Sequence, residues 1–373
     1  MIFTVPREIR ESEMRVGLTP AGVQALVNAG HTMYVEKEAG LSAGFQDVQY
    51  RHAGAEIVYS PAEAYQRGDV VVKVARPTAG EHSLFRPGQT ILSYLHLPVS
   101  SPDLLEALTA HQITAIAYEM IEEEDGHYPL LVPMSEIAGR LAPIIAGRHL
   151  MTINGGRGTL LSGIPGAPPA AVVILGGGVL GSNAARAFIS LGAQVTVLDK
   201  KLARLRKLEE QFGGRVATLL ATDYNVRRVA AFADVVVGCV QVPGHRAPIL
   251  LSREDVQAMR MGSVIVDFSI DQGGCVATSR PTTLFNPTYI EAGVIHYCVP
   301  NMTSGVARTA SYALTNSALP YLLELGAEGT ESLLSGRSAL ARGVNLYRGE
   351  IVHPELNGLR PQRIVATPTG GKR

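Results

Sequence analysis

The sequence predicts an α/β protein of two domains, each a mostly parallel sheet flanked by helices. Three observations predict this class. The chain of 373 residues is longer than one ordinary hydrophobic core requires. Its composition, 46% hydrophobic and 18% charged, is typical of globular proteins. Strand and helix patterns alternate along the chain, which favours parallel strands joined by helical crossovers.

The N-terminal part shows this alternation most clearly. A helix is expected to begin at Thr19–Pro20, because proline suits the first helical position. The remaining elements are strands at 31–36, 70–74, 90–97 and 113–118, with a helix at 102–111.

Two long helices are expected further along the chain. One begins at Ser135 as its N-cap and reaches about residue 150 with Pro143 inside it, and the other covers 306–325. Residues 155–170 are rich in glycine and proline and form either a hinge loop or an irregular hairpin. The polar tail from about residue 361 is expected to fray.

Charge and cysteine content exclude several classes of function. Acidic and basic residues balance at 33 each, so nothing favours binding to nucleic acid or to an anionic membrane. Cys239, Cys275 and Cys298 form no CxxC pair, which indicates reduced thiols in a cytoplasmic protein and no metal site. No apolar run approaches the length of a membrane span, and the charged N-terminus does not resemble a secretion signal. We expect a cytoplasmic enzyme or binding protein.

A glycine-rich turn in the middle of the chain carries the strongest chemical signal. A buried strand at 172–175 is followed by Gly176, Gly178 and Gly181, and then by a helix. The first glycine permits the tight turn, the second lets the backbone approach a diphosphate, and the third lets the helix pack on the strand. Amides and the dipole of the helix N-terminus would then hold the diphosphate. This pattern predicts a Rossmann-type dinucleotide-binding domain.

An acidic residue stands where the second strand of this unit ends. Asp199 follows the strand at 194–198 and lies 23 residues after Gly176. A carboxylate at about this spacing accepts hydrogen bonds from the ribose hydroxyls. Its charge also disfavours a 2′-phosphate, although Lys200 and Lys201 follow it, so NAD is expected in preference to NADP.

Nine further segments, in order, resemble one protein family. The sequence is similar to the alanine dehydrogenases, which are related to the dinucleotide-binding subunit of proton-translocating transhydrogenase. The resemblance covers nearly the whole chain. It rests on RVGLTPAGVQALVNAGH (15–31), YLHLP (94–98), IAYE (116–119), PLLVPMSEIAGRLAP (129–143), GGRGTLLSGIPG (155–166), VPGHRAP (242–248), VDFSIDQGGC (266–275), SRPTT (279–283) and YALTNSALPY (312–321). It implies a hexamer that reversibly deaminates L-alanine to pyruvate and ammonia with NAD.

The resemblance also implies roles for residues that handle the substrate. Arg15 matches the carboxylate anchor, which suits a guanidinium because it binds carboxylates bidentately. His96 matches the catalytic histidine at a strand end, and the ordinary pKa of histidine, near 6.5, suits proton transfer. Asp271 matches the second catalytic position, although an acid before Gly273 also suits a plain Asx turn. Glu119 and Met134 are expected near the substrate.

The cofactor-binding residues implied by the family extend beyond the glycines. Ser135 is expected near the phosphates, and Arg204 beside the adenosine or simply exposed on a helix. The residues expected to pack on the dinucleotide or its nicotinamide are Val179, Leu180, Val240, Gln241, Phe268, Ser269, Ile270, Val299, Asn301 and Met302.

One position departs from the family. The family usually reads VKVKEP, with the second lysine holding the substrate, whereas this chain has Lys73 followed by Val74, Ala75 and Arg76. Alanine donates no charge-assisted hydrogen bond. Strand alternation places Lys73 on the face of residue 75 and Arg76 on the opposite face. Three hypotheses follow: an alanine dehydrogenase, an oxidoreductase of the same family for a larger amino acid or imine, and a catalytically retired NAD-binding homologue.

The mid-chain Rossmann motif predicts a discontinuous domain plan. We expect residues 1–134 and 302–373 to form the substrate domain and residues 135–301 to form the NAD-binding domain. The two long helical segments are suited to act as hinge struts, and closure is expected to bring His96 to the nicotinamide.

Overall fold

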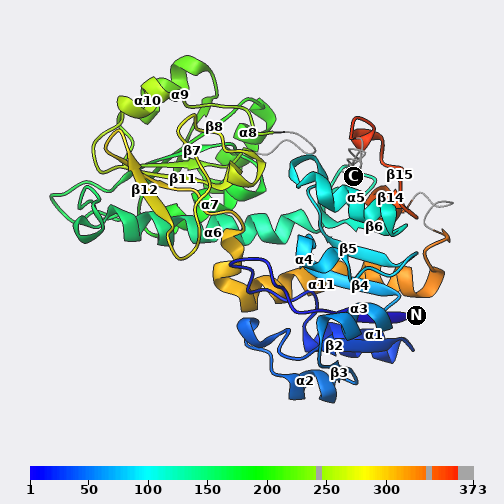
Figure 1. Ribbon diagram of the computed structural model, residues 1–373. Coiled ribbons are helices and arrows are strands. Elements are labelled where there is room, and N and C mark those ends of the chain that lie inside the picture. Colours follow the sequence, from blue (N-terminus) through cyan, green and yellow to red (C-terminus); the bar gives the residue numbers. More distant parts are fainter. Residues whose placement is uncertain (241–245, 333–337, 360–373) are drawn as a thin grey trace, which may run out of the picture. The chain divides into compact units, whose positions relative to one another are not determined.

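A computed structural model describes residues 1–240, 246–332 and 338–359. The chain divides into two compact units (Figure 1). Unit 1 comprises Met1–Arg10, Val16–Tyr128 and Ala318–Arg373, and unit 2 comprises Glu11–Arg15 and Pro129–Ser317. The expected polar tail and Gln241 lie outside the described residues. In the described part of the chain, no helix is both long and apolar enough to cross a membrane.

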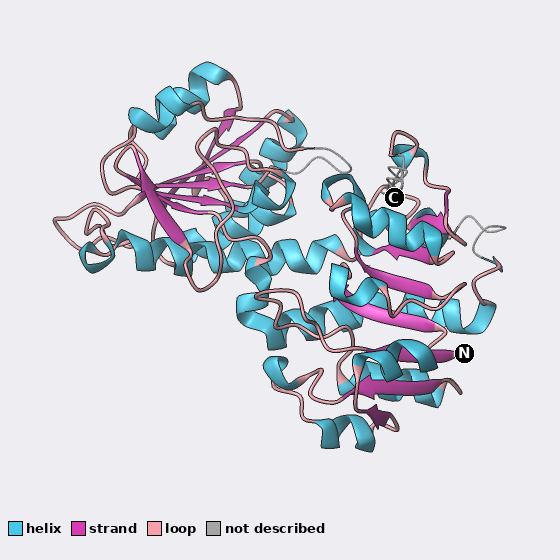
Figure 2. Cartoon of the chain, viewed as in Figure 1, coloured by secondary structure: helices cyan, strands magenta, loops and turns pink. Residues whose placement is uncertain are grey.

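Unit 1 is built on an eight-stranded sheet (Figure 2). The strand order is β15-β14-β6-β5-β4-β1-β2-β3. The first six strands of the chain pair in parallel, and β14 and β15 add antiparallel strands at one edge. The bounds are β1 Ile2–Val5, β2 Thr32–Glu36, β3 Glu56–Val58, β4 Val70–Ala75, β5 Thr90–Tyr94, β6 Thr114–Ala117, β14 Val344–Tyr347 and β15 Glu350–Ile351.

Helices connect the parallel strands of unit 1. They are α1 Pro20–Asn28, α2 Asp47–His52, α3 Pro61–Arg67, α4 Ala79–His82 and α5 Pro102–Ala110, and a further helix, α13 Ala339–Arg342, precedes β14. Leu104 and Leu108 of α5 pack with Ile91 and Ala115 of the central strands in one buried apolar cluster. The parallel strands therefore end together at one edge of the sheet, where α/β proteins gather their active sites.

Strand β4 contains an irregularity that alternation did not predict. Val72 pairs with Leu92 and Ala75 pairs with Tyr94, so β4 advances by three residues where β5 advances by two. The extra residue is a β-bulge, which breaks the alternation of faces along a strand. The sequence-based expectation placed Lys73 and Ala75 on one face of β4 and Arg76 on the other. It rested on a regular alternation that the bulge breaks.

Unit 2 is built on a seven-stranded sheet in the order β12-β13-β11-β10-β7-β8-β9. All neighbours pair in parallel except β12 and β13. The strands are β7 Ala171–Leu175, β8 Gln194–Asp199, β9 Val216–Leu220, β10 Val235–Gly238, β11 Val264–Asp267, β12 Thr288–Glu291 and β13 Val294–Tyr297. The helices are α6 Leu131–Leu150, α7 Val179–Ser190, α8 Leu202–Phe212, α9 Asp223–Ala230 and α10 Arg253–Gln257, and α11 Ala307–Glu328 begins here and continues into unit 1.

Both faces of this sheet are covered by helices. Val172 and Ile174 of β7 lie in a buried cluster with side chains of α6, α7 and α8. Val173 and Leu175, on the alternate face, pack with side chains of α9 and α10. A sheet that is covered on both faces requires strands that are apolar on both faces, and the continuous apolar runs of the sequence provide them. The predicted class, two mostly parallel sheets flanked by helices with one Rossmann-like domain, is confirmed.

Helix α6 begins five residues earlier than predicted. Its N-cap is Leu130 and it starts at Leu131, so Ser135 lies within the helix and is not its N-cap. Pro133 lies in the first turn, where a proline removes an amide that has no helical partner in any case. Pro143 lies inside the helix as expected.

The compact units and the predicted functional domains divide the chain at different residues. Residues 11–15, 129–134 and 302–317 group with unit 2, although the prediction assigned them to the substrate domain. The functional division into 1–134 with 302–373 and 135–301 stays a prediction.

Candidate active site

The glycine turn between β7 and α7 has the backbone that a diphosphate requires. Gly176 has a φ of 108°, and a Cβ there would lie 2.8 Å from the carbonyl oxygen of Cys239. A Cβ on Gly181 would collide with the carbonyl oxygen of Gly176. Gly178 is the N-cap of α7, and a Cβ built on it meets no atom within 4 Å. The turn is therefore an open cradle of backbone at a helix N-terminus, which fits the diphosphate of a dinucleotide.

Asp199 lies at the end of β8 and reaches this turn. Its carboxylate accepts hydrogen bonds from the amides of Gly177, at 2.8 Å, and Lys201, at 2.7 Å. The Arg204 guanidinium also donates to it at 3.2 Å. The structure thus brings Asp199 to the glycine turn, and Arg204 is a partner of its carboxylate. A ribose hydroxyl meeting Asp199 would lie directly beside the glycine cradle.

Helix α6 packs tightly on the same turn. A Cβ on Gly139 would lie 2.5 Å from the carbonyl oxygen of Leu180, so only glycine permits this approach. Ser135 lies one helical turn before Gly139 and therefore on the same face of α6. This position supports the expected proximity of Ser135 to the phosphates, while Val179 and Leu180 form the first turn of α7.

A buried aspartate that the sequence analysis missed shapes the loop after β11. The fully buried Asp267 accepts from the Ser269 amide at 2.9 Å, the Cys275 amide at 2.9 Å and the Ser279 hydroxyl at 2.7 Å. These bonds close the loop that carries Asp271. The Ser269 hydroxyl in turn accepts from the amide of Val240, which brings together two of the predicted cofactor residues. An acid at the end of a buried strand was the only available signal for Asp267.

Several of the residues predicted to contact the nicotinamide are buried or partly buried in unit 2. Ile270, Val299 and Met302 are buried in unit 2, where the latter two belong to its apolar core. Phe268 is partly buried and packs against that core. These side chains therefore act first as packing residues, while their backbone belongs to segments at the carboxyl edge of the sheet.

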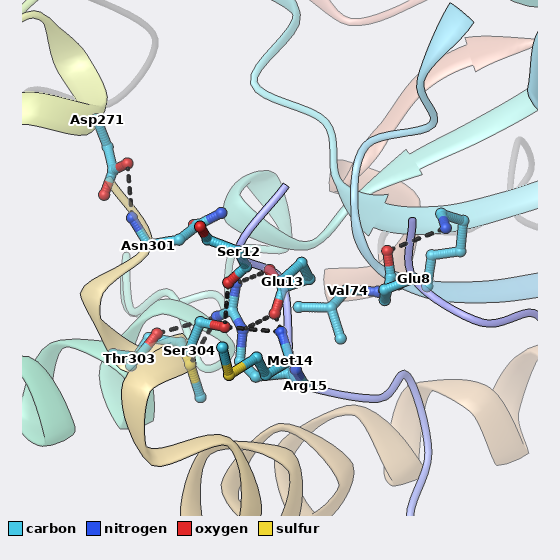
Figure 3. Close-up of polar contacts among 12 residues, drawn as sticks. Glu8, Ser12, Glu13, Met14, Arg15, Val74, Asp271, Asn301, Thr303 and Ser304 are labelled. Atoms are coloured by element: carbon cyan, nitrogen blue, oxygen red, sulfur yellow. Dashed lines mark hydrogen bonds and ion pairs between the residues drawn. The ribbon is translucent and has the colours of Figure 1, made fainter. Parts of the chain in front are cut away.

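Asp271 and Arg15, 256 positions apart, are attached to one short segment, residues 301–304 (Figure 3). The amide of Asn301 donates to Asp271 at 3.2 Å. The Arg15 guanidinium donates through Nη1 to the Thr303 hydroxyl at 3.0 Å. Asn301 has a left-handed backbone, with a φ of 54°, where the chain turns between these two contacts. The segment thus holds the predicted carboxylate anchor and a predicted catalytic acid in unit 2.

The same segment holds the backbone on either side of Glu13. The Ser304 hydroxyl accepts from the amide of Met14 at 2.8 Å and donates to the carbonyl oxygen of Ser12 at 2.7 Å. These two bonds dock residues 11–15 on unit 2, which explains why this short piece of the N-terminal region groups there.

Glu13 grips one edge of the Arg15 guanidinium. Its carboxylate accepts from Nε at 2.7 Å and from Nη2 at 2.6 Å, and it also accepts from the Arg15 amide at 3.0 Å. Both side chains are buried, at 3% and 0% exposure. On the other edge, Nη1 donates to the Thr303 hydroxyl and, at 3.5 Å, to the sulfur of Met134. Met134 and Arg15 are therefore in contact, as a shared substrate role requires.

Magnitudes decide which edge of Arg15 is able to open. Breaking a buried ion pair costs about 3–5 kcal/mol, because a charge is left buried and unpaired. A neutral hydrogen bond contributes only about 0.5–1.5 kcal/mol. Glu13 is therefore a lasting partner of Arg15, and the Nη1 edge is the one that exchanges partners at small cost.

In unit 1, Glu119 fixes the backbone at His96. Its carboxylate accepts from the amide of His96 at 2.6 Å and from the amide of Leu95 at 3.2 Å. His96 follows β5 with a left-handed backbone, a φ of 45°, that a non-glycine residue adopts only at a cost. The His96 ring stacks near that of Tyr94, with centroids 6.1 Å apart, and its Nδ1 lies 3.8 Å from Glu119. Glu119 thus contacts His96 mainly by hydrogen bonds from the backbone, and its distance to the imidazole ring is longer.

Lys73 is committed to an internal network. Its ammonium lies 3.0 Å from Glu8 and 2.8 Å from Glu81, and all three side chains are at most 3% exposed. Burial opposes the charged form, but the two carboxylates outweigh it and raise the pKa of Lys73 above its ordinary value. Glu8 also accepts from the Val74 amide at 2.7 Å, within the bulge of β4. Lys73 therefore replaces no missing donor at Ala75.

Comparisons with known proteins agree on one family. Residues 4–138 match the N-terminal domain and residues 142–354 the C-terminal domain of the family described as alanine dehydrogenase/PNT. An alanine dehydrogenase from Methanococcus maripaludis is 46% identical over 354 residues, covering 95% of each chain. One from Mycolicibacterium smegmatis is 42% identical over 352 residues, covering 94% of this chain and 95% of its own.

Solved structures give the same answer. A structure of an L-alanine dehydrogenase superposes with a TM-score of 0.90 at 47% identity, covering 95% of this chain and 97% of the other. A transhydrogenase from Sinorhizobium meliloti shares the fold, with a TM-score of 0.82 at 23% identity over 94% of this chain and all of the other. The resemblance predicted from the sequence is confirmed, and the chain belongs to the alanine dehydrogenase/PNT family.

Proposed function

We propose that the protein catalyses the NAD-dependent, reversible oxidative deamination of L-alanine to pyruvate and ammonium. The observation that carries the proposal is the attachment of Arg15 and Asp271 to one segment, residues 301–304. A guanidinium for a carboxylate and a carboxylate for an amine are the two contacts by which an amino acid is recognised. Relatives named alanine dehydrogenase, 42–46% identical over most of the chain, support this substrate.

The residues divide the chemistry among themselves. When bound, NAD⁺ would supply the acceptor for the hydride that leaves Cα of the amino acid. Arg15 holds the carboxylate, and Asp271 holds the ammonium group, which releases one proton to solvent before the hydride leaves. As water adds to the resulting imino acid, His96 accepts a proton from the water and later returns it to the departing amine. General acid–base catalysis of this kind contributes about 10²–10⁴-fold to the rate.

Glu119 supports His96 in this reaction. By accepting from the amides of Leu95 and His96, it holds the turn in the conformation that presents the ring. It is a positioning residue in our proposal, because its contacts are with the backbone of the catalytic residue.

Unit 2 holds the cofactor in the proposed complex. The amides at the start of α7 bind the diphosphate, and Asp199 accepts from the ribose. NAD is preferred to NADP because a 2′-phosphate would meet the buried Asp199 carboxylate. The remaining predicted cofactor contacts, from Ser135 to Met302, belong to this proposal.

Ala75 supports a second candidate activity. The residue is buried, and Lys73 is held by two glutamates, so no lysine of β4 is available to a substrate. An alanine also leaves the volume of a lysine side chain, which suits a larger 2-oxo acid or imine. The third hypothesis, a retired NAD-binding homologue, requires that neither class of substrate reacts.

We also propose a cytoplasmic homo-oligomer. Unit 2 exposes several large apolar side chains near one another. Ile153 is 90% exposed, and Gly155, two residues later, lies beside the exposed side chain of Ile290. The Arg157 amide bonds to Gly262, beside the exposed Met261. An apolar surface of this kind suits contact with a second copy, and the family implies a hexamer. Three free cysteines suit a reducing compartment.

A substrate panel tests the proposed function. NADH oxidation is followed at 340 nm with ammonium and each of pyruvate, 2-oxobutyrate, 2-oxoisovalerate and phenylpyruvate. The proposal expects the highest kcat/KM with pyruvate. A higher value with a larger oxo acid would favour the second candidate, and NADH binding without any turnover would favour the third.

A further inference from the structure

The Thr303 hydroxyl occupies a position that the sequence analysis left unassigned. It is buried in unit 2 and accepts a hydrogen bond from Nη1 of Arg15. In that bond the hydroxyl acts only as an acceptor, and its own proton remains to be donated. It is therefore a potential donor at the exchangeable edge of the guanidinium.

The two edges of the Arg15 guanidinium have partners of different kinds. Glu13 occupies Nε and Nη2 and is buried, whereas Nη1 contacts a hydroxyl and a thioether. The sulfur of Met134 is a weak acceptor, so a carboxylate oxygen replaces it with a gain in hydrogen bonding.

We propose that the substrate carboxylate binds at the Nη1 edge of Arg15 and that Thr303 is its second hydrogen-bond donor. One carboxylate oxygen takes the place of the Met134 sulfur at Nη1, and the other accepts from the Thr303 hydroxyl. Glu13 stays on the opposite edge as a positioning residue. This assignment rests on the proposed function, and it supplies a donor for the carboxylate in a chain where Ala75 supplies none.

The segment 301–304 gives this arrangement its geometry. Asn301 donates to Asp271, and Thr303 contacts Arg15 only two residues later. The carboxylate site and the acid proposed to hold the ammonium group are thereby attached to one short piece of backbone. This shared attachment orients a ligand that carries a carboxylate next to an amino group.

The test compares Thr303→Val with Thr303→Ser. Thr303→Val removes the donor and keeps the shape, so KM for pyruvate should rise about 10-fold or more, the effect of one hydrogen bond to a charged group. Because the contact holds the carboxylate throughout the reaction, kcat should change little. Thr303→Ser keeps the hydroxyl and should return KM to within about 3-fold of wild type. Ser252→Ala, which removes a hydroxyl at the N-cap of α10, is the matched control with unchanged KM.

A binding measurement separates this inference from the proposed function. Pyruvate is titrated into the NAD⁺-loaded proteins by calorimetry, and Thr303→Ala replaces the valine variant if the latter does not fold. Weaker pyruvate binding with unchanged NADH affinity supports the assignment. Equal binding by wild type and the variants lacking the hydroxyl overturns it and leaves the proposed function intact. A wild type that neither binds nor reduces any 2-oxo acid overturns both.

Discussion

Among the described residues, each unit buries one lysine or arginine side chain, and the two are partnered differently. In unit 1, Lys73 lies between two buried carboxylates, Glu8 and Glu81. In unit 2, Arg15 is paired with the buried carboxylate of Glu13 along one edge and donates to Thr303 and Met134 from the other. A buried cation that already has two anions gains little from a third. One with a single anion and an exchangeable edge is able to bind a ligand, so the number of internal carboxylates separates a structural cation from an anchor.

Removing the cation of unit 2 is expected to have the largest effect on catalysis. Arg15→Met should reduce kcat/KM for pyruvate by about 100-fold or more, because a charge-assisted contact in a buried site is lost. The variant also leaves Glu13 buried without its cation, so Arg15→Met combined with Glu13→Gln controls for instability. Steady-state kinetics with wild-type efficiency in the double variant would contradict the role of Arg15.

The corresponding change in unit 1 should affect stability instead. Lys73→Met removes the ammonium that pairs with the buried Glu8 and Glu81 and should cost about 3–5 kcal/mol of unfolding free energy. KM for pyruvate in the remaining folded protein should stay within about 3-fold of wild type. Urea unfolding and kinetics on the same preparation measure both quantities. An increase in KM as large as that of Arg15→Met would show that Lys73 binds substrate after all.

The residues that were predictable and those that were not differ in a physical way. The glycine turn and Asp199 were predictable because their spacing along one βαβ unit determines their spacing in the fold. Thr303 was not, since its role depends on a contact with Arg15, 288 positions away along the chain. Glu13 lies only two positions from Arg15, but no motif marked it as the partner of the guanidinium. The bulge of β4 left no trace in an apolar strand. Helix α6 was misplaced by five residues because serine is a favoured N-cap residue.

Asp199 is a third buried charge, and its partner is the guanidinium of Arg204. Asp199→Ala releases Arg204, whose guanidinium would then favour the 2′-phosphate of NADP. We expect the preference for NADH over NADPH to narrow by about 10-fold or more, the effect of one charge-assisted contact. Calorimetric titration of both cofactors measures it. Equal affinity of the wild type for the two would already refute the assigned role of Asp199.

Buried histidines provide the smallest expected effect. Burial lowers the pKa of His149 and of His296 below the ordinary 6.5. The unfolded chain therefore takes up protons at a pH where the folded protein does not, so unfolding free energy should fall as pH drops below about 6.5. Urea unfolding at pH 7.5 and 5.5 measures the slope, and His149→Phe should reduce it. A slope unaffected by that change would remove His149 from the account.

The most direct test of the account follows the hydride itself. The protein is incubated with NAD⁺ and L-alanine that carries deuterium at Cα, and the nucleotide is analysed by mass spectrometry. The account predicts NADH that contains the deuterium, formed together with pyruvate and ammonium, and the loss of nearly all of this product in His96→Ala. Bound NAD⁺ that acquires no deuterium from L-alanine would contradict the proposal that this chain is an L-alanine dehydrogenase.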